Sequence, residues 1–579
     1  MRSIFTFFGI LTKKQKLKFT IIFILMIIAM LLDVLGISMI IPIINALNGS
    51  GVSSYFIYIE NLIHFLNLNN LNDNIYVLIG FFLGLIFTLK VFVISLLNWV
   101  QAKFNYEIFL FIATKLFKGY LAIPFSDYLK LDSGTVIKNN TNEVYNFSAV
   151  LNQFLLVIID ILVMLGLFIL LIIYDPISFL ILSVSLLLPV LLYYYLLKKF
   201  QIDWGIRREL HEGEIIKSIQ NGLGAIKDIK VLGREDNFIN NHKYHTIELA
   251  KVDLFKSFIQ VSNKYWLEYI FILGLFILGT YHTLIVNDPV KFLSVAALFA
   301  AAGFRVLPSL NRVVNGFQYI NFYLPSIDII ISELKKLNSN LQTNKKNLSF
   351  NKEVTLKNIS YYYSSKNYKA LKDINLSFHK GDAIGIVGVS GSGKSTLINI
   401  LLGLLKPSTG KFFIDGNPVD NNLNSWQSLI GFVPQSTFLI NDTILSNIAF
   451  GIPKKEIDFK KIDKCIKLSS LESTIASMPN KFNTYVGERG IKLSGGQLQR
   501  IGIARALYDD PEILILDEAT NALDSDTENQ ILETISKLQG KKTIIMITHN
   551  TLNLSKFDKI YKLNDGKIED FGEYLKSIR

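Results

Sequence analysis

The sequence is poor in cysteine and in charge. It has one cysteine, Cys465, in 579 residues, which excludes an intrachain disulfide and a cysteine-based metal cluster. Charged residues make up only 18% of the chain, whereas 50% of the residues are hydrophobic, an imbalance that is unusual for a wholly soluble protein. The deficit of charge is uneven, because long apolar runs lie within the first 315 residues and the composition is ordinary from about residue 340. At this length the chain exceeds a single domain, so we expect a membrane half followed by a soluble half.

The membrane half contains several stretches that reach the roughly 20 apolar residues needed for a span. The first apolar patch is short and followed by lysines, so we expect no cleaved signal peptide. Residues 46–75 hold no Lys or Arg, whereas 101–148 and 198–264 hold many, which predicts that both termini face the cytoplasm. The transmembrane domain is predicted over residues 1–335, with α-helical spans at about 19–47, 75–100, 149–174, 176–198, 265–287 and 289–315.

The loops of the membrane half carry three further predictions. Residues 53–66 form an outer amphipathic helix that either lies in the membrane interface or caps the ends of the spans. The two long cytoplasmic segments continue the membrane helices and turn near 122–128, where Pro124 ends a helix, and near 221–228. These turns either couple the membrane domain to the soluble half or are ordinary solvated hairpins.

Charged side chains within spans are costly and usually face a cavity or a partner. Three of them are basic and would suit an anionic cargo such as a phosphorylated headgroup. The alternative is that they pair with acidic residues of the spans or extend to the cytoplasmic edge. The basic residues are Lys90, Lys264 and Arg305, and the acidic ones are Asp33, Asp160 and Glu268.

The soluble half begins after a polar linker at 336–350 and covers residues 351–579. Its main feature is a glycine-rich loop between an apolar strand at 383–387 and a helix at 397–402, the context that makes a phosphate-binding loop credible. Backbone N–H groups of such a loop surround phosphate oxygens. Lys394 would reach the β- and γ-phosphates, and the Ser395 hydroxyl would hold Mg²⁺. The predicted ATP-binding residues are Gly388, Val389, Ser390, Gly391, Ser392, Gly393, Lys394, Ser395 and Thr396.

Further candidates follow other apolar strands. Gln435 is the last residue of a strand at 430–435 and could contact Mg²⁺ or the attacking water. Asp517 and Glu518 end the strand at 513–516; Asp517 would hold the Mg²⁺ shell and Glu518 would polarise the attacking water. His549 ends the strand at 543–548, where parallel sheets bind ligands, and could contact the γ-phosphate.

Two more features flank these strands. Tyr363 either stacks on a nucleotide base or is a tyrosine at a strand edge. A second glycine-rich loop precedes a helix and is a second possible phosphate site, which suggests a dimer whose loops complete each other's sites. Its residues are Leu493, Ser494, Gly495, Gly496 and Gln497.

Together these motifs resemble the nucleotide-binding domain of the ATP-binding cassette (ABC) superfamily, an α/β P-loop NTPase. The resemblance identifies 493–497 as the signature loop, acting in trans on a partner's ATP, and Asn521 and Asp524 as the D-loop, with Asn521 where Ser is usual. It implies ATP and Mg²⁺ as cofactors and an ATPase activity that drives transport.

The spans ahead of this domain resemble an exporter-type half-transporter, which works as a dimer. Residues 143–148, 304–309, 311–312 and 325–330 and the outer helix resemble the flippase family that moves lipid-linked oligosaccharides for bacterial protein N-glycosylation. The resemblance implies a homodimer in the bacterial inner membrane that flips a polyprenyl-diphosphate-linked glycan and binds no nucleic acid. The alternatives are export of a peptide, drug or other glycolipid, and a regulatory or channel-like protein gated by ATP.

Overall fold

The computed structural model describes residues 9, 11–38, 75–286, 289–338, 349–363, 368–419, 422–520, 525–549 and 551–570. The predicted outer helix at 53–66 and the D-loop residues Asn521 and Asp524 lie outside these ranges. The chain divides into two compact units. One comprises Met1–Ile123 with Lys130–Leu341, and the other comprises Pro124–Leu129 with Gln342–Arg579.

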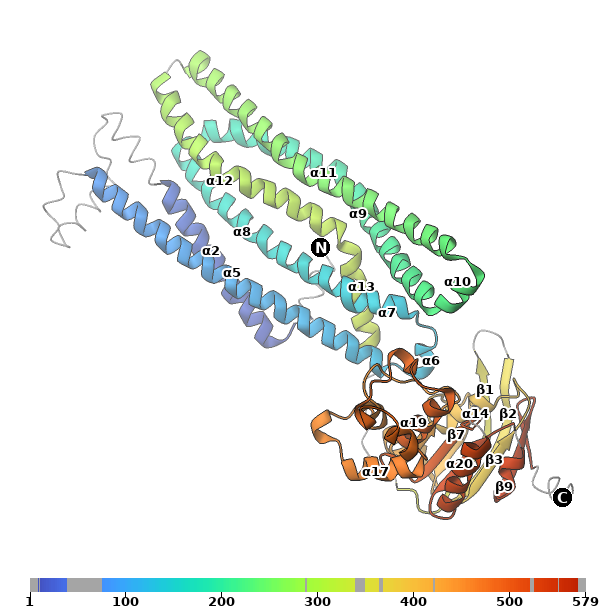
Figure 1. The fold of residues 1–579 in the computed structure, drawn as a ribbon. Helices are drawn as coiled ribbons and strands as arrows, with labels where there is room; N and C mark the ends of the chain where they lie inside the picture. The colour runs from blue at the N-terminus through green and yellow to red at the C-terminus, as the bar shows by residue number, and fades with distance from the viewer. Residues whose placement is uncertain are drawn as a thin grey trace, which may run out of the picture. The chain divides into compact units, whose positions relative to one another are not determined.

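The first unit is a bundle of long helices (Figure 1). Continuous apolar sequence forms helices here because a helix satisfies its own backbone hydrogen bonds without water. The side chain of Asp175 caps the start of one of them by accepting from the backbone N–H of Ile177 at 3.2 Å, just before a proline at the first helical position. The helices are α2 (Lys13–Ser38), α5 (Ile75–Ala122), α7 (Ser133–Lys138), α8 (Val144–Tyr174), α9 (Pro176–Gly224), α10 (Ile226–Leu232), α11 (Glu235–Tyr281), α12 (Pro289–Phe322) and α13 (Leu324–Asn338), with a π-helical turn, η2 (Asn139–Glu143), between α7 and α8.

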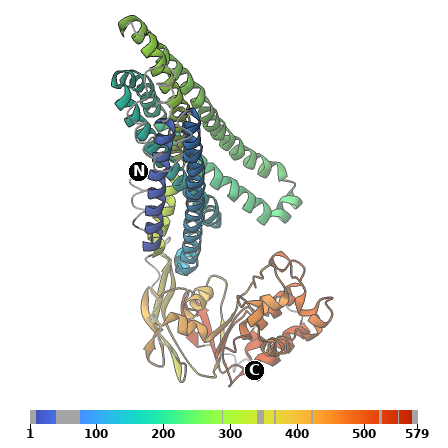
Figure 2. The same ribbon diagram turned by 90° about the vertical axis from the view of Figure 1, so that its left-hand side faces the viewer.

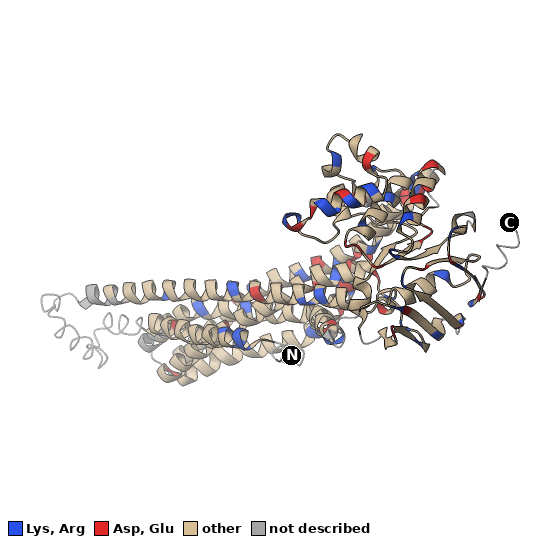
Figure 3. Ribbon diagram, turned by 90° about the horizontal axis from the view of Figure 1, so that it is seen from below, with Lys and Arg blue, Asp and Glu red and all other residues tan. Residues whose placement is uncertain are grey.

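Among the described residues, five helices are long and apolar enough to cross a membrane, within Lys13–Ser38, Leu83–Ala122, Ser133–Tyr174, Pro176–Gly224 and Glu235–Ile285. The predicted span at 289–315 lies within α12 and stays a prediction. The 49 residues of α9 extend about 73 Å at 1.5 Å per residue, far beyond the roughly 30 Å hydrocarbon layer. The predicted continuation of the membrane helices is therefore confirmed. Figure 3 shows few charged residues along most of the bundle and many near one end.

Neighbouring helices pack along their lengths. α9 and α11 lie side by side as an antiparallel hairpin, and α8 packs against α12 and α2 (Figures 1 and 2). The hairpin turns through α10, which ends at Gly233 in the left-handed conformation (φ +60°). The second predicted turn, near 221–228, is confirmed because α9 ends at Gly224.

The second unit contains two sheets. A four-stranded antiparallel sheet has the order β2-β1-β4-β5, formed by β1 (Glu353–Tyr363), β2 (Tyr368–His379), β4 (Thr409–Ile414) and β5 (Asn417–Pro418). A six-stranded sheet has the order β10-β9-β3-β8-β7-β6. Its strands are β3 (Ala383–Val387), β6 (Ile430–Val433), β7 (Ile513–Asp517), β8 (Thr543–Ile547), β9 (Lys559–Asn564) and β10 (Lys567–Asp570).

The strands β9, β3, β8, β7 and β6 run parallel. β3 and β8 are buried along their whole length, as expected for parallel strands covered on both faces. Helices α14 (Lys394–Leu401), α19 (Gly495–Leu507) and α20 (Ser525–Leu538) belong to this unit. The carboxyl ends of the parallel strands meet at one edge of the sheet, which brings the segments after β3, β6, β7 and β8 together.

A short helix from the first half of the sequence belongs to this second unit. α6 (Phe125–Tyr128) follows the break at Pro124, and Phe125 packs against the hydrophobic core that contains Ile384 and Leu397. The predicted turn at 122–128 is therefore confirmed as a turn, and the Phe125 side chain packs against the core of the second unit.

Candidate functional site

The phosphate-binding loop connects β3 to α14. Lys394, at the start of α14, is 8% exposed and donates to the carbonyl oxygens of Gly388 at 2.7 Å and Val389 at 3.0 Å. Burial lowers the pKa of Lys394, against the opposing effect of Glu518 and Asp517. Gly393 has φ +105°, and a Cβ there would lie 2.6 Å from the Ala370 carbonyl oxygen, so only glycine fits.

One observation tests directly whether this loop fits a phosphate. The Ser392 side chain is 4% exposed, and its hydroxyl oxygen has no hydrogen-bond partner within the protein. A buried hydroxyl without a partner costs free energy, and a phosphate oxygen would satisfy it. Together with the ammonium group of Lys394, the donor set fits the triphosphate of ATP.

Glu518 lies between two other predicted catalytic residues. Its carboxylate accepts from Gln435 Nε2 at 2.7 Å, and its other oxygen lies 2.7 Å from His549 Nε2. The three residues follow β6, β7 and β8, whose ends the parallel sheet aligns. Glu518 is 7% exposed and has φ +48°, a strained conformation that is typical of functional positions. The structure thus brings together Glu518, predicted to polarise the attacking water, with Gln435, predicted to contact Mg²⁺ or that water, and His549, predicted to contact the γ-phosphate.

Asp517 is the candidate carboxylate for the Mg²⁺ shell. Burial and, to a lesser extent, the neighbouring charge of Glu518 raise its pKa to about 6, and Lys394 opposes both effects. No cluster of three or more His, Cys, Asp or Glu side chains among the described residues is arranged to hold a metal ion. Mg²⁺ commonly binds through one or two protein groups and the substrate's phosphates; Asp517, Ser395 and Gln435 are the residues that would hold it.

Tyr363 lies beside the loop helix. Its hydroxyl is 3.2 Å from the Thr396 hydroxyl, and its ring meets that of Tyr361 edge to face at 5.0 Å. The position next to α14 is compatible with the predicted contact to a nucleotide base, which stays a prediction.

The signature loop forms the start of α19. The Gln497 backbone N–H donates to the Ser494 hydroxyl at 3.3 Å, and the Ser494 N–H donates to the Gln497 side chain at 3.0 Å. This reciprocal capping box fixes the first turn of the helix and leaves the loop's N–H groups at a helix N-terminus.

The sequence analysis missed the residue that secures this helix. Arg505 of α19 donates to the carbonyl oxygens of Asn447 at 2.8 Å and Phe438 at 2.9 Å, so it ties the signature helix to the segment that follows Gln435. Burial lowers the pKa of Arg505 to about 10. In the sequence, only the position of Arg505, two helical turns after a glycine-rich loop, could have indicated this role, and such a position is not specific.

The membrane cations have acidic partners. Lys90 and Arg305 both contact Asp33, at 2.5 and 2.6 Å, although they lie on α5 and α12 and Asp33 on α2. Lys264 lies apart from them, 3.9 Å from Glu268 on its own helix. The structure therefore brings together two of the three predicted cargo residues.

The alternative that the three cations pair with acidic residues of the spans agrees with these contacts to Asp33 and Glu268, but not for Asp160. Asp160 accepts two hydrogen bonds from Arg312, at 2.8 and 2.6 Å. The two residues lie on neighbouring helices, α8 and α12, and the bidentate geometry suits arginine.

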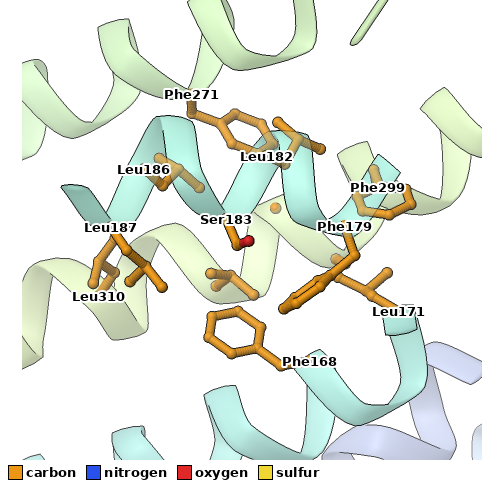
Figure 4. Close-up of a pocket in the computed structure, with 13 residues that line it drawn as sticks. Phe168, Leu171, Phe179, Leu182, Ser183, Leu186, Leu187, Phe271, Phe299 and Leu310 are labelled. Atoms are coloured by element: carbon orange, nitrogen blue, oxygen red, sulfur yellow. The ribbon is translucent and has the colours of Figure 1, made fainter. Parts of the chain in front are cut away.

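Several pockets lie in the described part of the membrane unit, and two of them bear on the size of a cargo. The pocket in Figure 4 lies among apolar side chains such as Phe168, Phe179 and Phe271, and its volume of about 30 Å³ is far below the size of a lipid headgroup. A larger pocket of about 400 Å³ lies between α9, α11 and α12 and is lined by aromatic and aliphatic side chains, including Tyr193, Trp266 and Tyr269.

The fold and the site define a P-loop nucleotide-binding domain joined to a bundle of membrane-length helices. Residues 371–521 match the family model described as ABC transporter. The chain resembles an ATP-dependent lipid A-core flippase from Cupriavidus metallidurans, with 35% identity over 39% of this chain and 38% of the relative. It also resembles the multidrug resistance-like ATP-binding protein MdlA from Buchnera aphidicola, with 29% identity over 87% of this chain and 90% of the relative. The chain thus matches little more than a third of the flippase's length.

The solved structure of a bacterial Atm1-family ABC exporter with ATP bound superposes with a TM-score of 0.74 over 95% of this chain and 96% of that chain, at 22% identity. This likeness shows the fold. The second unit thus matches the ABC transporter family model, and the chain has the fold of that solved ABC exporter. The matched residues 371–521 lie within the second unit.

Proposed function

We propose that this protein is an ATP-driven flippase that works as a dimer of two identical chains and moves an anionic, lipid-linked oligosaccharide from the inner to the outer leaflet of the bacterial inner membrane. The observation that carries the ATP-driven step is the carboxylate of Glu518 held between Gln435 and His549 at 2.7 Å, at the sheet edge that carries the phosphate-binding loop. Glu518 would accept a proton from the attacking water, His549 and Gln435 would orient the carboxylate, and Lys394 would stabilise the phosphates.

The dimer is supported by exposed apolar side chains at the far end of the α9–α11 hairpin. Leu223, Val231 and Leu232 are 69%, 85% and 64% exposed, in a segment that the charge pattern assigns to the cytoplasm. Clustered exposed apolar residues usually mark an interaction site. We expect a second copy of this chain to cover them, and its signature loop to complete the nucleotide site.

The anionic cargo is supported by the charges around Asp33. Two cations, Lys90 and Arg305, share this one acid, so the group keeps a net positive charge within helices that cross the membrane. An uncompensated charge there is costly, and an anionic headgroup would neutralise it. A diphosphate carries suitable charge, and relatives that match 39% of this chain are named ATP-dependent lipid A-core flippases.

A second candidate function is export of an apolar drug or peptide. It is favoured by the similarity to the multidrug resistance-like protein over most of the chain and by the aromatic pocket of about 400 Å³ beside Trp266, a size that suits a small molecule.

Phosphate release from the protein in lipid nanodiscs distinguishes the two candidates. We expect a polyprenyl-diphosphate-linked glycan to stimulate release, and Arg305→Ala to abolish this stimulation while the basal rate remains. Lys251→Ala, which removes an exposed lysine of α11 paired with Glu248, is the matched control. Stimulation by apolar drugs and none by the anionic lipid would contradict the proposed cargo.

A further inference from the structure

A buried group of charges lies in the membrane unit away from Asp33. Arg208 of α9 is 1% exposed and Glu143 of η2 is fully buried. Glu143 lies between two cations, with Arg208 Nη2 at 3.7 Å and Lys138 Nζ at 3.9 Å. Neither carboxylate oxygen of Glu143 accepts a hydrogen bond, and Arg208 Nε has no acceptor. The charges are therefore close but not joined by the hydrogen bonds that such pairs usually form at about 2.7–2.9 Å.

Arg208 also holds the break between α12 and α13. Its guanidinium donates to the Ser326 hydroxyl at 2.9 Å and lies 4.6 Å from the centre of the Tyr323 ring. Tyr323 falls between the two helices, and Pro325 follows it. Three residues before Arg208, a Cβ on Gly205 would lie 2.0 Å from the Phe322 carbonyl oxygen, so α9 touches the break directly through its backbone.

The second helix of the hairpin contacts the same break. Lys256 of α11 donates to the Tyr323 hydroxyl at 3.0 Å and lies 4.6 Å from the centre of the Phe322 ring. Two cations, one from α9 and one from α11, thus hold the two aromatic residues at the point where α12 gives way to α13. α13 is the last helix before the nucleotide-binding unit in the sequence.

Stability alone does not account for these charges. Burying an ion pair costs about as much as its attraction returns, and well-packed apolar residues often stabilise as much. A buried carboxylate whose oxygens accept no hydrogen bond adds a further cost. Buried charges of this kind can favour one conformation over another, because the free energy of their contacts changes steeply when the helices shift by a small distance.

We propose that Glu143 and Arg208 are positioning residues that form a latch between the α9–α11 hairpin and the α12–α13 break. The latch is closed in one conformation of the transport cycle and released in the other, so it sets the equilibrium between them. This inference rests on the proposed ATP-driven cycle. Glu143, at the junction of η2 and α8, positions the guanidinium group of Arg208. That guanidinium group in turn contacts Ser326 and Tyr323.

The chain offers a matched control for this role. Glu212 lies one turn after Arg208 on α9 and accepts from Arg208 Nη1 at 2.8 Å. Glu212→Gln removes a carboxylate from the same guanidinium, but within one helix. Glu143→Gln removes the carboxylate that links two parts of the bundle. A purely structural need to neutralise Arg208 would make the two variants similar, whereas a latch would make only Glu143→Gln change the conformational equilibrium.

The test measures distances between spin labels on Leu210→Cys in α9 and Ser332→Cys in α13, both at exposed positions. The native Cys465 does not interfere, because it is buried and burial raises the pKa of its thiol to about 11. The full chain is studied in nanodiscs, with labelled chains diluted by unlabelled ones, without nucleotide and after trapping with ATP and vanadate. Phosphate release is measured on the same samples.

We expect two distinct distances in the otherwise unmodified protein, one for each condition. Glu143→Gln should change the ratio of the two populations about fivefold or more in the nucleotide-free sample, the lower end of typical coupling between sites, and Glu212→Gln should leave the ratio unchanged. Arg208→Lys, which keeps the charge but loses the planar fork, should shift the ratio in the same direction as Glu143→Gln and provides a second variant if that one fails to fold.

The possible contradictions are separable. Unchanged distances in a protein that releases phosphate would overturn the latch alone, as would equal effects of Glu143→Gln and Glu212→Gln. A protein that releases no phosphate under any condition would contradict the proposed function and the latch with it.

Discussion

Replacing Glu518 with glutamine tests the catalytic arrangement most sharply. The substitution keeps the size of the side chain and removes its charge. The carboxylate now accepts from Gln435 Nε2 and lies beside His549 Nε2, each at 2.7 Å. A glutamine can offer one oxygen, but its amide group would face the other neighbour as a second donor, so one of the two contacts is lost and the proton acceptor disappears.

The expected loss of rate follows from the role of a general base. Such a group contributes about 10²- to 10⁴-fold, which corresponds to roughly 3–5 kcal/mol in the activation free energy at about 1.4 kcal/mol per tenfold. Binding of ATP should change little, because Lys394 and the loop of β3 and α14 do not depend on the Glu518 charge for their fold. We therefore expect kcat to fall at least 100-fold while the dissociation constant for ATP changes by no more than about threefold.

The assay is phosphate release by the full chain in nanodiscs, together with equilibrium binding of a fluorescent ATP analogue. Glu533→Gln is the matched control, since Glu533 pairs with Lys537 on the surface of α20 and its loss should change neither quantity. The reasoning is refuted if Glu518→Gln retains more than about a tenth of the rate, because loss of a general base should lower the rate at least about 100-fold. It is also refuted if ATP binding weakens in proportion to the rate.

Three further predictions concern the phosphates, the metal and the membrane charges. Lys394→Ala should weaken ATP binding at least about tenfold, because a charge-assisted hydrogen bond contributes about 1.5–3 kcal/mol; unchanged affinity in the same binding assay would contradict its assigned contact. Burial raises the pKa of Asp517 to about 6, so as pH falls through this value the carboxyl takes up a proton and loses the charge that Mg²⁺ requires. The apparent Mg²⁺ affinity for ATP hydrolysis should then weaken about tenfold per pH unit below 6. Asp517→Asn should remove this pH dependence. An Mg²⁺ affinity that does not change with pH in the unmodified protein would contradict the prediction. Asp33→Asn leaves Lys90 and Arg305 without their shared acid, so we expect thermal unfolding to show a fall of about 3–5 kcal/mol in the free energy of unfolding. Adding Lys90→Met should restore part of this loss. No loss in the single variant would show that the contacts contribute little.

The nucleotide site was predictable because its parts lie at the ends of apolar strands. Once β3, β6, β7 and β8 are assigned to one parallel sheet, topology requires that the segments after them meet at the same edge. The meeting of Gln435, Glu518 and His549 is therefore a consequence of patterns that each strand carries locally.

The membrane charges were not predictable to the same extent, because hydropathy does not give the rotation of each helix or its neighbours. Arg305 contacts Asp33 from 272 residues further along the chain, and nothing local in the sequence indicates that Lys90 joins them while Lys264 does not. Asp160 similarly pairs with Arg312, a residue that the sequence analysis did not consider as its partner.

Two features of the fold depend on long-range packing in the same way. Phe125 packs against the core of the second unit, although it lies between membrane helices in the sequence. Arg208 was counted only as one of many basic residues in a cytoplasmic segment, and its burial against Tyr323 depends on how α9 meets the α12–α13 break.

The most direct test of the proposed function is ATP-dependent movement of lipid in vesicles that contain this chain alone. A fluorescent polyprenyl-diphosphate-linked glycan is reconstituted with the protein, and the fraction in each leaflet is measured with a membrane-impermeant quencher. We predict that ATP with Mg²⁺ shifts the lipid away from the leaflet on the nucleotide side, and that Glu518→Gln abolishes the shift. No ATP-dependent movement, or movement that persists in Glu518→Gln, would contradict it.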